Sequence, residues 1–149
     1  MTQITRAVNE PILSFAPGSP ERASLQAKYD EMATQTIEIP LIIDGKEIKT
    51  GDTGNCVMPH NHQHVLATYH NAGETEVIQA IDAAMKSWKT WSTTTLEERT
   101  KIFRKAAELL QGPWRDTINA ATMLNQSKNA FQAEIDAACE LIDFWNFNC

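Results

Sequence analysis

The chain has 149 residues, about the length of one domain, and 13 Lys and Arg against 19 Asp and Glu give a formal net charge of -6. Nucleic-acid-binding domains usually gather basic residues on one face, so we expect no nucleic-acid partner. Hydrophobic residues make up 42% and charged residues 21%, which is ordinary globular usage and excludes wholesale disorder. No apolar run approaches the roughly 18 residues of a membrane span, so no membrane span is expected.

The first ten residues and the cysteines indicate in which cellular compartment the protein is expected. Residues 1–10 lack both the apolar core of a secretory signal and the Arg-rich composition of a transit peptide, which predicts a cytoplasmic protein, and we expect a bacterial source. Three widely spaced cysteines fit neither a disulfide framework nor a zinc site. Cys139 lies beside Glu140 and near Asp136, and this acidic neighbourhood is expected to raise its pKa and argues against a nucleophile.

The first half of the sequence predicts an extended arm, one helix and short strands. Residues 9–20 contain three prolines and form the arm. Ser19 before Pro20 is the order of an N-cap and a first helical position, so we expect a helix from Pro20 to about Ala33. The predicted strands are 39–43 and 46–48, joined by the two-residue turn Asp44-Gly45, and then a second pair near 56–58 and 65–69 around a loop.

The second half predicts helices. From Glu74 an apolar stripe at helical spacing is expected to face the core; it consists of Val77, Ile81, Ala84, Met85 and Trp88. Residues 95–98 form a capping box that starts another helix, and Gly112-Pro113 ends it and opens the next. We expect most of the four tryptophans at core positions. The predicted fold class is mostly α-helical, with a small antiparallel hairpin region near 39–69.

The last predicted helix begins near Asn129 and continues to Cys149. At about 100° per residue it carries two apolar stripes: one of Phe131, Ile135, Ala138, Ile142 and Trp145, and a second of Ala133, Ala137, Phe144 and Phe147. A helix that is apolar on two faces is buried between layers, and no stop signal follows it. We therefore expect the chain to end in mid-helix with part of its core missing, and to associate through Phe144 and Phe147.

Two groups of residues are candidates for metal or cofactor chemistry. His60, His62 and His64 alternate, as metal ligands can, but no carboxylate or cysteine stands near them in sequence, so a surface turn is favoured and no metal is predicted. The sequence contains neither G-x-G-x-x-G nor G-x-x-x-x-G-K-[ST]. We therefore predict no cofactor-binding residues within this chain.

Glu140 is the one candidate binding residue. On a helical wheel it falls inside the second apolar stripe, between Ala137 and Phe144, and a carboxylate there is costly to bury unless it meets a cation. One interpretation is an exposed helix glutamate paired with water or lysine. The other is a substrate-facing anion that receives an ammonium group. The pattern leaves both open.

Several segments resemble a known family. They are Ala7-Val8-Asn9-Glu10-Pro11, the stretch 18–22, the stretch 61–65, and above all the run from Ala106 to Asn148, including Gln132 to Phe144. These residues resemble the N-terminal part of the delta-1-pyrroline-5-carboxylate dehydrogenases (L-glutamate gamma-semialdehyde dehydrogenases) of the aldehyde dehydrogenase superfamily. The resemblance covers nearly the whole chain. It departs from the family at His60, where relatives often carry Phe, and at 125–128, which replaces a more Gly-rich segment.

The resemblance implies a fold and a function. The complete enzyme would have the α/β aldehyde dehydrogenase fold, with 1–38 as an arm and helix and 39–149 as the start of the cofactor-binding domain, truncated before its Rossmann-like core. It would oxidise L-glutamate gamma-semialdehyde, a small aldehyde, to glutamate with NAD in proline degradation, as a homo-oligomer. The family's nucleophilic Cys, general-base Glu and oxyanion-hole Asn lie further along, so no catalytic residue is expected here and the chain alone is expected to be inactive. Glu140 matches the family's helix glutamate near the substrate's amino group.

A hypothesis of a different class is a stand-alone helical protein-interaction module, whose two-sided last helix docks a partner. The gene sequence beyond Cys149 separates the two: a catalytic Cys, Glu and Asn region there supports the enzyme, and a stop codon supports the module.

Overall fold

The computed structural model describes residues 6–149, which form two compact units. One unit combines the chain up to Thr34 with Leu96–Cys149, and the other is Gln35–Thr95. The domain boundary expected at 38/39 concerns the complete enzyme and stays a prediction. Within residues 6–149, no helix is both long and apolar enough to cross a membrane.

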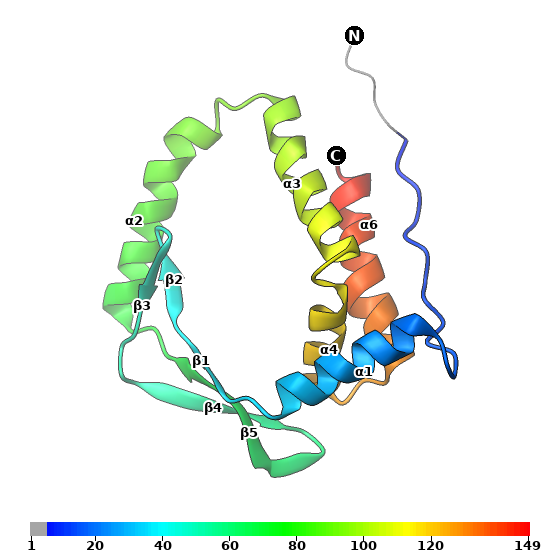
Figure 1. Cartoon of the computed structure of the whole chain (residues 1–149). Helices are drawn as coiled ribbons and strands as arrows, with labels where there is room; N and C mark the ends of the chain where they lie inside the picture. The colour runs from blue at the N-terminus through cyan, green and yellow to red at the C-terminus, as the bar shows by residue number, and fades with distance from the viewer. Residues whose placement is uncertain (1–5) are drawn as a thin grey trace. The chain divides into compact units, whose positions relative to one another are not determined.

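In the first unit, helix α1 (Pro20–Ala33) packs against α4 (Arg115–Gln126) (Figure 1). Ser19 is its N-cap, because its hydroxyl accepts a hydrogen bond from the Arg22 N–H at 3.3 Å. The predicted bounds of α1 are confirmed. Its predicted face is confirmed as well: Leu25 is buried with Phe15 and Ala120, and the partly buried residues Leu13, Tyr29, Met32, Met123 and Ala130 pack around them.

Helix α3 (Leu96–Gln111) packs along α6 (Glu140–Phe147), as the yellow-green and red ribbons of Figure 1 show. The contact buries Ala107, Leu110 and Ile142. Helix α3 ends directly before Gly112-Pro113, where the sequence predicts a stop. The side chains buried at this contact are all small or aliphatic.

The last predicted helix is made of three segments. It begins with α5 (Ala130–Ala133), continues as the π-helix η1 (Glu134–Cys139) and ends as α6. Asn129 caps the start, since its side chain accepts from the Gln132 N–H at 2.9 Å while the Gln132 side chain accepts from the Asn129 N–H at 3.1 Å. The predicted start is therefore confirmed. The helix ends at Phe147, with the Asn148 N–H bonded to the Phe144 carbonyl, so the expectation that it runs through Cys149 is wrong.

The π segment changes which side chains share a face. A π turn holds more residues than an α turn, so a constant 100° per residue does not apply across Glu134–Cys139. The buried positions draw on both predicted stripes: Ala138 and Ile142 come from the first and Ala133 from the second. Phe131, Phe144 and Phe147 are all more than half exposed. The two-sided stripe is thus not a pair of continuous faces.

The second unit contains two small sheets. In the larger, β5 (Asn61–His70) lies between β4 (Thr53–Met58), which is antiparallel to it, and β1 (Ile37–Ile39), which is parallel. The smaller is the hairpin of β2 (Leu41–Ile43) and β3 (Lys46–Ile48). Its predicted turn is confirmed, because Asp44 and Gly45 both have positive φ angles, 50° and 72°.

Pro40 separates two strands where the sequence predicts one from 39 to 43. Proline has no N–H to donate to a sheet, and the chain leaves β1 there and enters β2. The segment therefore joins two different sheets. The pairing of β1 with β5 is parallel, which the expected antiparallel hairpins do not include.

Helix α2 (Glu74–Trp91) buries none of its residues. Val77, Ile81, Met85 and Trp88, expected to face the core, are each at least 50% exposed. Trp91 and Trp114 are also exposed, so the expectation that the tryptophans fill the core is wrong for these positions. The helix instead meets the hairpin through its small residues, with Ala80, Ala83, Ala84 and Ser87 bordering a shallow recess beside Ile42 and Ile43.

The α3–α6 contact generates a stability prediction. Ile142→Ala should lower the free energy of unfolding by about 2–5 kcal/mol, because the side chain is fully buried and its removal leaves a cavity. Phe144→Ala, two residues away but exposed, should cost less than about 1 kcal/mol. Urea unfolding followed by circular dichroism measures both. Equal losses would contradict the burial described here.

Candidate functional site

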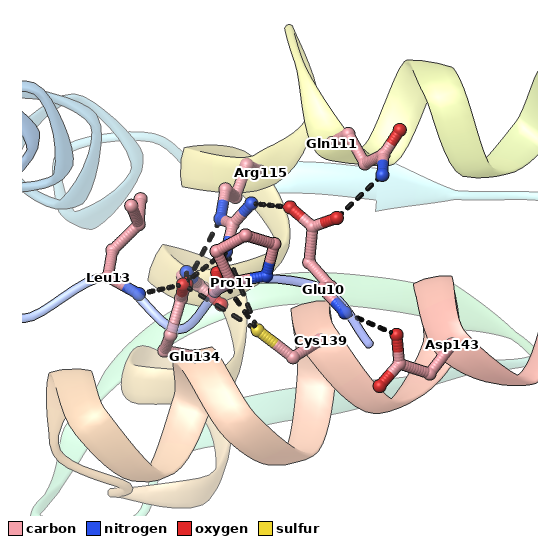
Figure 2. A network of polar contacts seen from close by, with 9 residues as sticks. Glu10, Pro11, Leu13, Gln111, Arg115, Glu134, Cys139 and Asp143 are labelled. Carbon is pink, nitrogen blue, oxygen red and sulfur yellow. Dashed lines mark hydrogen bonds and ion pairs between the residues drawn. The ribbon is translucent and has the colours of Figure 1, made fainter. Parts of the chain in front are cut away.

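A buried ion pair lies at the centre of the first unit (Figure 2). Arg115 is the first residue of α4, and Glu134 is the first residue of the π segment. Their side chains are 9% and 0% exposed. Arg115 donates to Glu134 from Nη2 and also from Nε, at 3.3 Å. The guanidinium thus donates two hydrogen bonds to the carboxylate, and such two-donor pairs between arginine and a carboxylate are strong.

Glu134 accepts two further hydrogen bonds. The Leu13 N–H donates to Oε1 at 2.9 Å, and the Asn119 side-chain amide donates to Oε2 at 2.7 Å. Burial by itself would raise the pKa of Glu134, but the donors on Arg115, Leu13 and Asn119 together lower it below its ordinary value. Burial by itself would lower the pKa of Arg115, but its hydrogen bonds to the Glu134 and Glu10 carboxylates raise it above its ordinary value. Both groups are therefore charged at neutral pH.

The N-terminal arm is tied to this ion pair through a segment that we call the strap, Asn9–Leu13. Arg115 donates to the Glu10 carboxylate and, at 2.8 Å, to the Pro11 carbonyl. The Glu10 N–H donates to Asp143 Oδ1 at 2.7 Å, and the Asn9 side chain donates to Asp143 Oδ2 at 2.8 Å. Figure 2 shows Glu10 between Arg115, Gln111 and Asp143. The strap therefore connects α3, α4 and the last helix.

Cys139 ends the π segment beside the ion pair. Its thiol lies 3.5 Å from Arg115 Nη2 and 3.7 Å from Glu134 Oε1. Burial, with the negative charge of Glu134, raises the pKa of Cys139 to about 11. The predicted direction of the pKa shift is confirmed, but the acid responsible is Glu134, not its neighbours in sequence. A buried, neutral thiol of this kind does not fit a catalytic nucleophile.

Glu140 lies on another part of the same helix. It is exposed, and it borders an open recess of about 350 Å³ between α4 and the last helix. The other residues of the recess are Ile118, Thr122, Gln126, Lys128, Asp136, Ala137, Leu141 and Phe144. Within residues 6–149 no side chain forms an ion pair with Glu140, and Lys128 pairs with Asp136 at 2.6 Å. The recess thus combines an apolar wall with a carboxylate that has room for a cation.

The sequence analysis missed Arg115 and Glu134, although one signal pointed to them. At the i±3 and i±4 positions Glu134 has only apolar neighbours: Ala130, Phe131, Ala137 and Ala138. Glu140 has Asp136 and Asp143 at two of its four such positions. A carboxylate among apolar neighbours needs a cation when it is buried, and by this pattern Glu134 is a stronger candidate for such a pair than Glu140.

The histidines lie on the second unit. His60 is in the tight turn between β4 and β5, whereas His62 and His64 belong to β5, so the predicted loop is shorter than expected. Among the described residues no group of three His, Cys, Asp or Glu side chains is arranged to hold a metal ion.

Within residues 6–149, the junction between strand β5 and the N-terminus of helix α2 is the candidate position for binding a dinucleotide. Such ligands place their pyrophosphate on the amides of a helix N-terminus. Here the Gly73 N–H donates to the Glu76 carboxylate at 2.8 Å, and Glu74 adds a second negative charge to the first turn. A phosphate would meet two carboxylates, so these residues do not fit a dinucleotide.

Comparison with known proteins identifies the family. The model of the aldehyde dehydrogenase family matches residues 47–149. The chain belongs to the aldehyde dehydrogenase family. A delta-1-pyrroline-5-carboxylate dehydrogenase of Agaricus bisporus is 48% identical over 140 residues, covering 93% of this chain and 26% of the relative. The human mitochondrial delta-1-pyrroline-5-carboxylate dehydrogenase is 42% identical over 147 residues, covering 99% of this chain and 26% of the relative.

Solved structures agree. The delta-pyrroline-5-carboxylate dehydrogenase of Mycobacterium tuberculosis, determined bound with NAD, matches 99% of this chain with a TM-score of 0.96 and 44% identity, over 28% of its own chain. A 1-pyrroline-5-carboxylate dehydrogenase from Thermus with bound NAD matches 97% with a TM-score of 0.90 and 28% identity. The expected family and fold class are confirmed. The chain spans about a quarter of the length of these relatives, and the predicted cytoplasmic location stays a prediction.

The buried ion pair generates a prediction about pH. Glu134→Gln should lower the free energy of unfolding at pH 7 by roughly 3 kcal/mol, because it leaves Arg115 buried without its main counter-charge. The pKa of Glu134 is lower in the folded chain than its ordinary value of 4.5. Its contribution is therefore complete above about pH 4.5 and is lost as the pH falls through the folded-state pKa.

Urea titrations of both forms between pH 3 and pH 7 measure this effect, and the two curves should converge at the acid end. Glu108→Gln, at an exposed ion pair with Lys105, is the matched control and should change stability by less than about 1 kcal/mol. A loss for Glu134→Gln that is the same at pH 3 and pH 7 would contradict the assignment of a buried, ionised carboxylate.

The thiol of Cys139 generates a second prediction. With a pKa of about 11 and a buried sulfur, it should react with iodoacetamide at pH 8 only after unfolding, since the thiolate is the reactive form. Mass spectrometry of the alkylated chain, native and in urea, locates the label. Complete labelling of Cys139 in the folded chain within minutes would show that its surroundings are open.

Proposed function

We propose that this chain supplies the substrate-recognition surface of an NAD-dependent dehydrogenase that oxidises L-glutamate gamma-semialdehyde to L-glutamate in proline degradation. One observation carries the proposal: relatives named delta-1-pyrroline-5-carboxylate dehydrogenase match 93–99% of the chain, whereas the general family model begins at residue 47. The strap and α1 lie before residue 47, in the part of the chain that these relatives share and the general family model does not match. The alternative, a stand-alone interaction module, has no such observation in its favour.

Glu140 is the residue that we propose to contact the substrate. Glutamate gamma-semialdehyde carries an α-ammonium group, and a charge-assisted hydrogen bond to a carboxylate suits such a group. The open recess beside Glu140 supports this role, since its carboxylate has no cation among the described side chains. Leu141 and Phe144 offer apolar contact to the aliphatic part of the substrate.

The chemical step belongs to other parts of the complete enzyme. NAD supplies the oxidation when bound, as in the Mycobacterium tuberculosis and Thermus relatives, but the junction of β5 and α2 does not fit a dinucleotide, for the reason given above. Cys139 does not fit the nucleophile either. We therefore propose that residues 6–149 bind and orient the substrate and hold neither catalytic nor cofactor-binding groups.

We also propose that the complete enzyme is a homo-oligomer. Several large apolar side chains are exposed on this chain, among them Ile81, Met85 and Trp88 of α2 and Phe144 and Phe147 of α6. Exposed apolar patches of this kind are typical of surfaces that another part of a protein or a partner covers.

The role of Glu140 is tested in a chimeric enzyme, in which residues 1–149 replace the matching segment of the Mycobacterium tuberculosis relative. Glu140→Ala should lower kcat/KM for glutamate gamma-semialdehyde by about 10- to 150-fold, equivalent to the roughly 1.5–3 kcal/mol of a hydrogen bond to a charged group. Simple aliphatic aldehydes lack the ammonium group, so kcat/KM for propanal should change far less.

Glu97→Ala is the control, because Glu97 is an exposed helix glutamate outside the recess, and it should leave both substrates unaffected. If Glu140→Ala slowed both substrates equally, Glu140 would be a structural residue of the helix and its proposed role would be wrong.

A further inference from the structure

We propose that the strap Asn9–Leu13 positions Glu140 for the substrate, acting through Glu134 and Asp143. The inference rests on the proposed role of Glu140. Glu134 lies six residues before Glu140 and Asp143 three residues after it. The strap thus holds the helix on both sides of the proposed binding residue, and Asn9, Glu10 and Leu13 make these contacts without lining the recess.

The contacts at the two ends differ in the burial of the carboxylate, which is fully buried for Glu134 and half-buried for Asp143. At the first end, the Leu13 N–H and Arg115 hold the fully buried carboxylate of Glu134. At the second end, Asp143 accepts from the Glu10 N–H at 2.7 Å and from the Asn9 side chain at 2.8 Å. Figure 2 shows these two ends joined through Glu10 and Pro11. All are hydrogen bonds to a charged group, which are stronger than those between neutral groups.

The first part of the segment between Glu134 and Asp143 is a π-helix, so the strap holds a stretch whose winding determines where Glu140 points. The π segment runs from Glu134 to Cys139, and Glu140 follows it directly. Because a π turn contains an extra residue compared with an α turn, a change to α-helical winding would rotate Glu140 around the helix axis. The strap contacts both ends of the π segment, at Glu134 through Leu13 and at Cys139, whose sulfur lies 3.9 Å from the Pro11 carbonyl.

Asp143 and Asn9 are therefore positioning residues: neither lines the recess, and their contacts with each other fix the orientation of the helix that carries Glu140. A loosened strap should weaken capture of the ammonium-bearing aldehyde and leave a simple aldehyde unaffected. A residue that only stabilises the fold would affect both substrates alike.

The test uses Asp143→Ala and the milder Asn9→Ala in the chimeric enzyme. Each should lower the ratio of kcat/KM for glutamate gamma-semialdehyde to kcat/KM for propanal by about 3- to 30-fold, the usual range for coupling between residues that act through others, mainly through a higher KM. In the Glu140→Ala background the same substitutions should produce no further decrease of the ratio. Asp82→Ala, at an exposed aspartate of α2, is the matched control and should leave the ratio unchanged.

Hydrogen exchange of the 149-residue chain gives a second readout that needs no catalytic part. Asp143→Ala should speed exchange of the amides of residues 135–141, and Asp82→Ala should not. Unchanged exchange would overturn the inference, whatever the kinetics.

The kinetic outcomes also separate the two proposals. If Glu140→Ala lowers the substrate ratio while Asp143→Ala and Asn9→Ala do not, the strap does not position Glu140 and only the inference fails. If Glu140→Ala leaves the ratio unchanged, the proposed function of Glu140 fails, and its positioning by the strap is overturned with it.

Discussion

The buried charge of Glu134 is the constraint on which the first unit depends. A carboxylate that is fully buried must be matched by donors, or its desolvation would cost several kcal/mol. Here the donors come from two distant parts of the chain: Arg115 and Asn119 on α4, and the Leu13 amide of the arm. Satisfying one charge therefore fixes α4, the last helix and the arm against one another, and it explains why an extended arm without regular structure is held in place.

Two sides of the last helix carry residues with different roles. One side carries Glu134, Cys139 and Asp143, which contact the strap, and the other carries Ala137, Glu140 and Phe144, which line the recess. The Glu134 carboxylate is thus buried and paired with Arg115, whereas the carboxylate proposed to bind substrate is exposed and has no cation among residues 6–149. This contrast is the physical basis for assigning binding to Glu140 and positioning to the residues that contact the strap.

Short sequence patterns predicted the structure correctly where interactions between neighbouring residues determine it. Ser19 before Pro20, the Asp44-Gly45 turn and Asn129 each act within four residues, and each feature they predict is confirmed. Partners far apart in sequence were not foreseeable in this way: Arg115 bonds Pro11 across 104 residues. The helical wheel gave wrong faces beyond Glu134 because it assumes a single helical period. The prediction that the apolar stripe of α2 faces the core was wrong because amphipathic spacing indicates that a face is apolar but not what covers it.

The account depends on one contact, between the Glu140 carboxylate and the α-ammonium group of the substrate. A crystal structure of the chimeric enzyme with the product L-glutamate bound tests it directly. The account predicts an ammonium nitrogen at about 2.8 Å from a Glu140 oxygen, the usual length of a charge-assisted hydrogen bond, with the strap contacts to Glu134 and Asp143 in place. Product whose ammonium group is held by other residues, with the Glu140 carboxylate turned toward solvent, would contradict it.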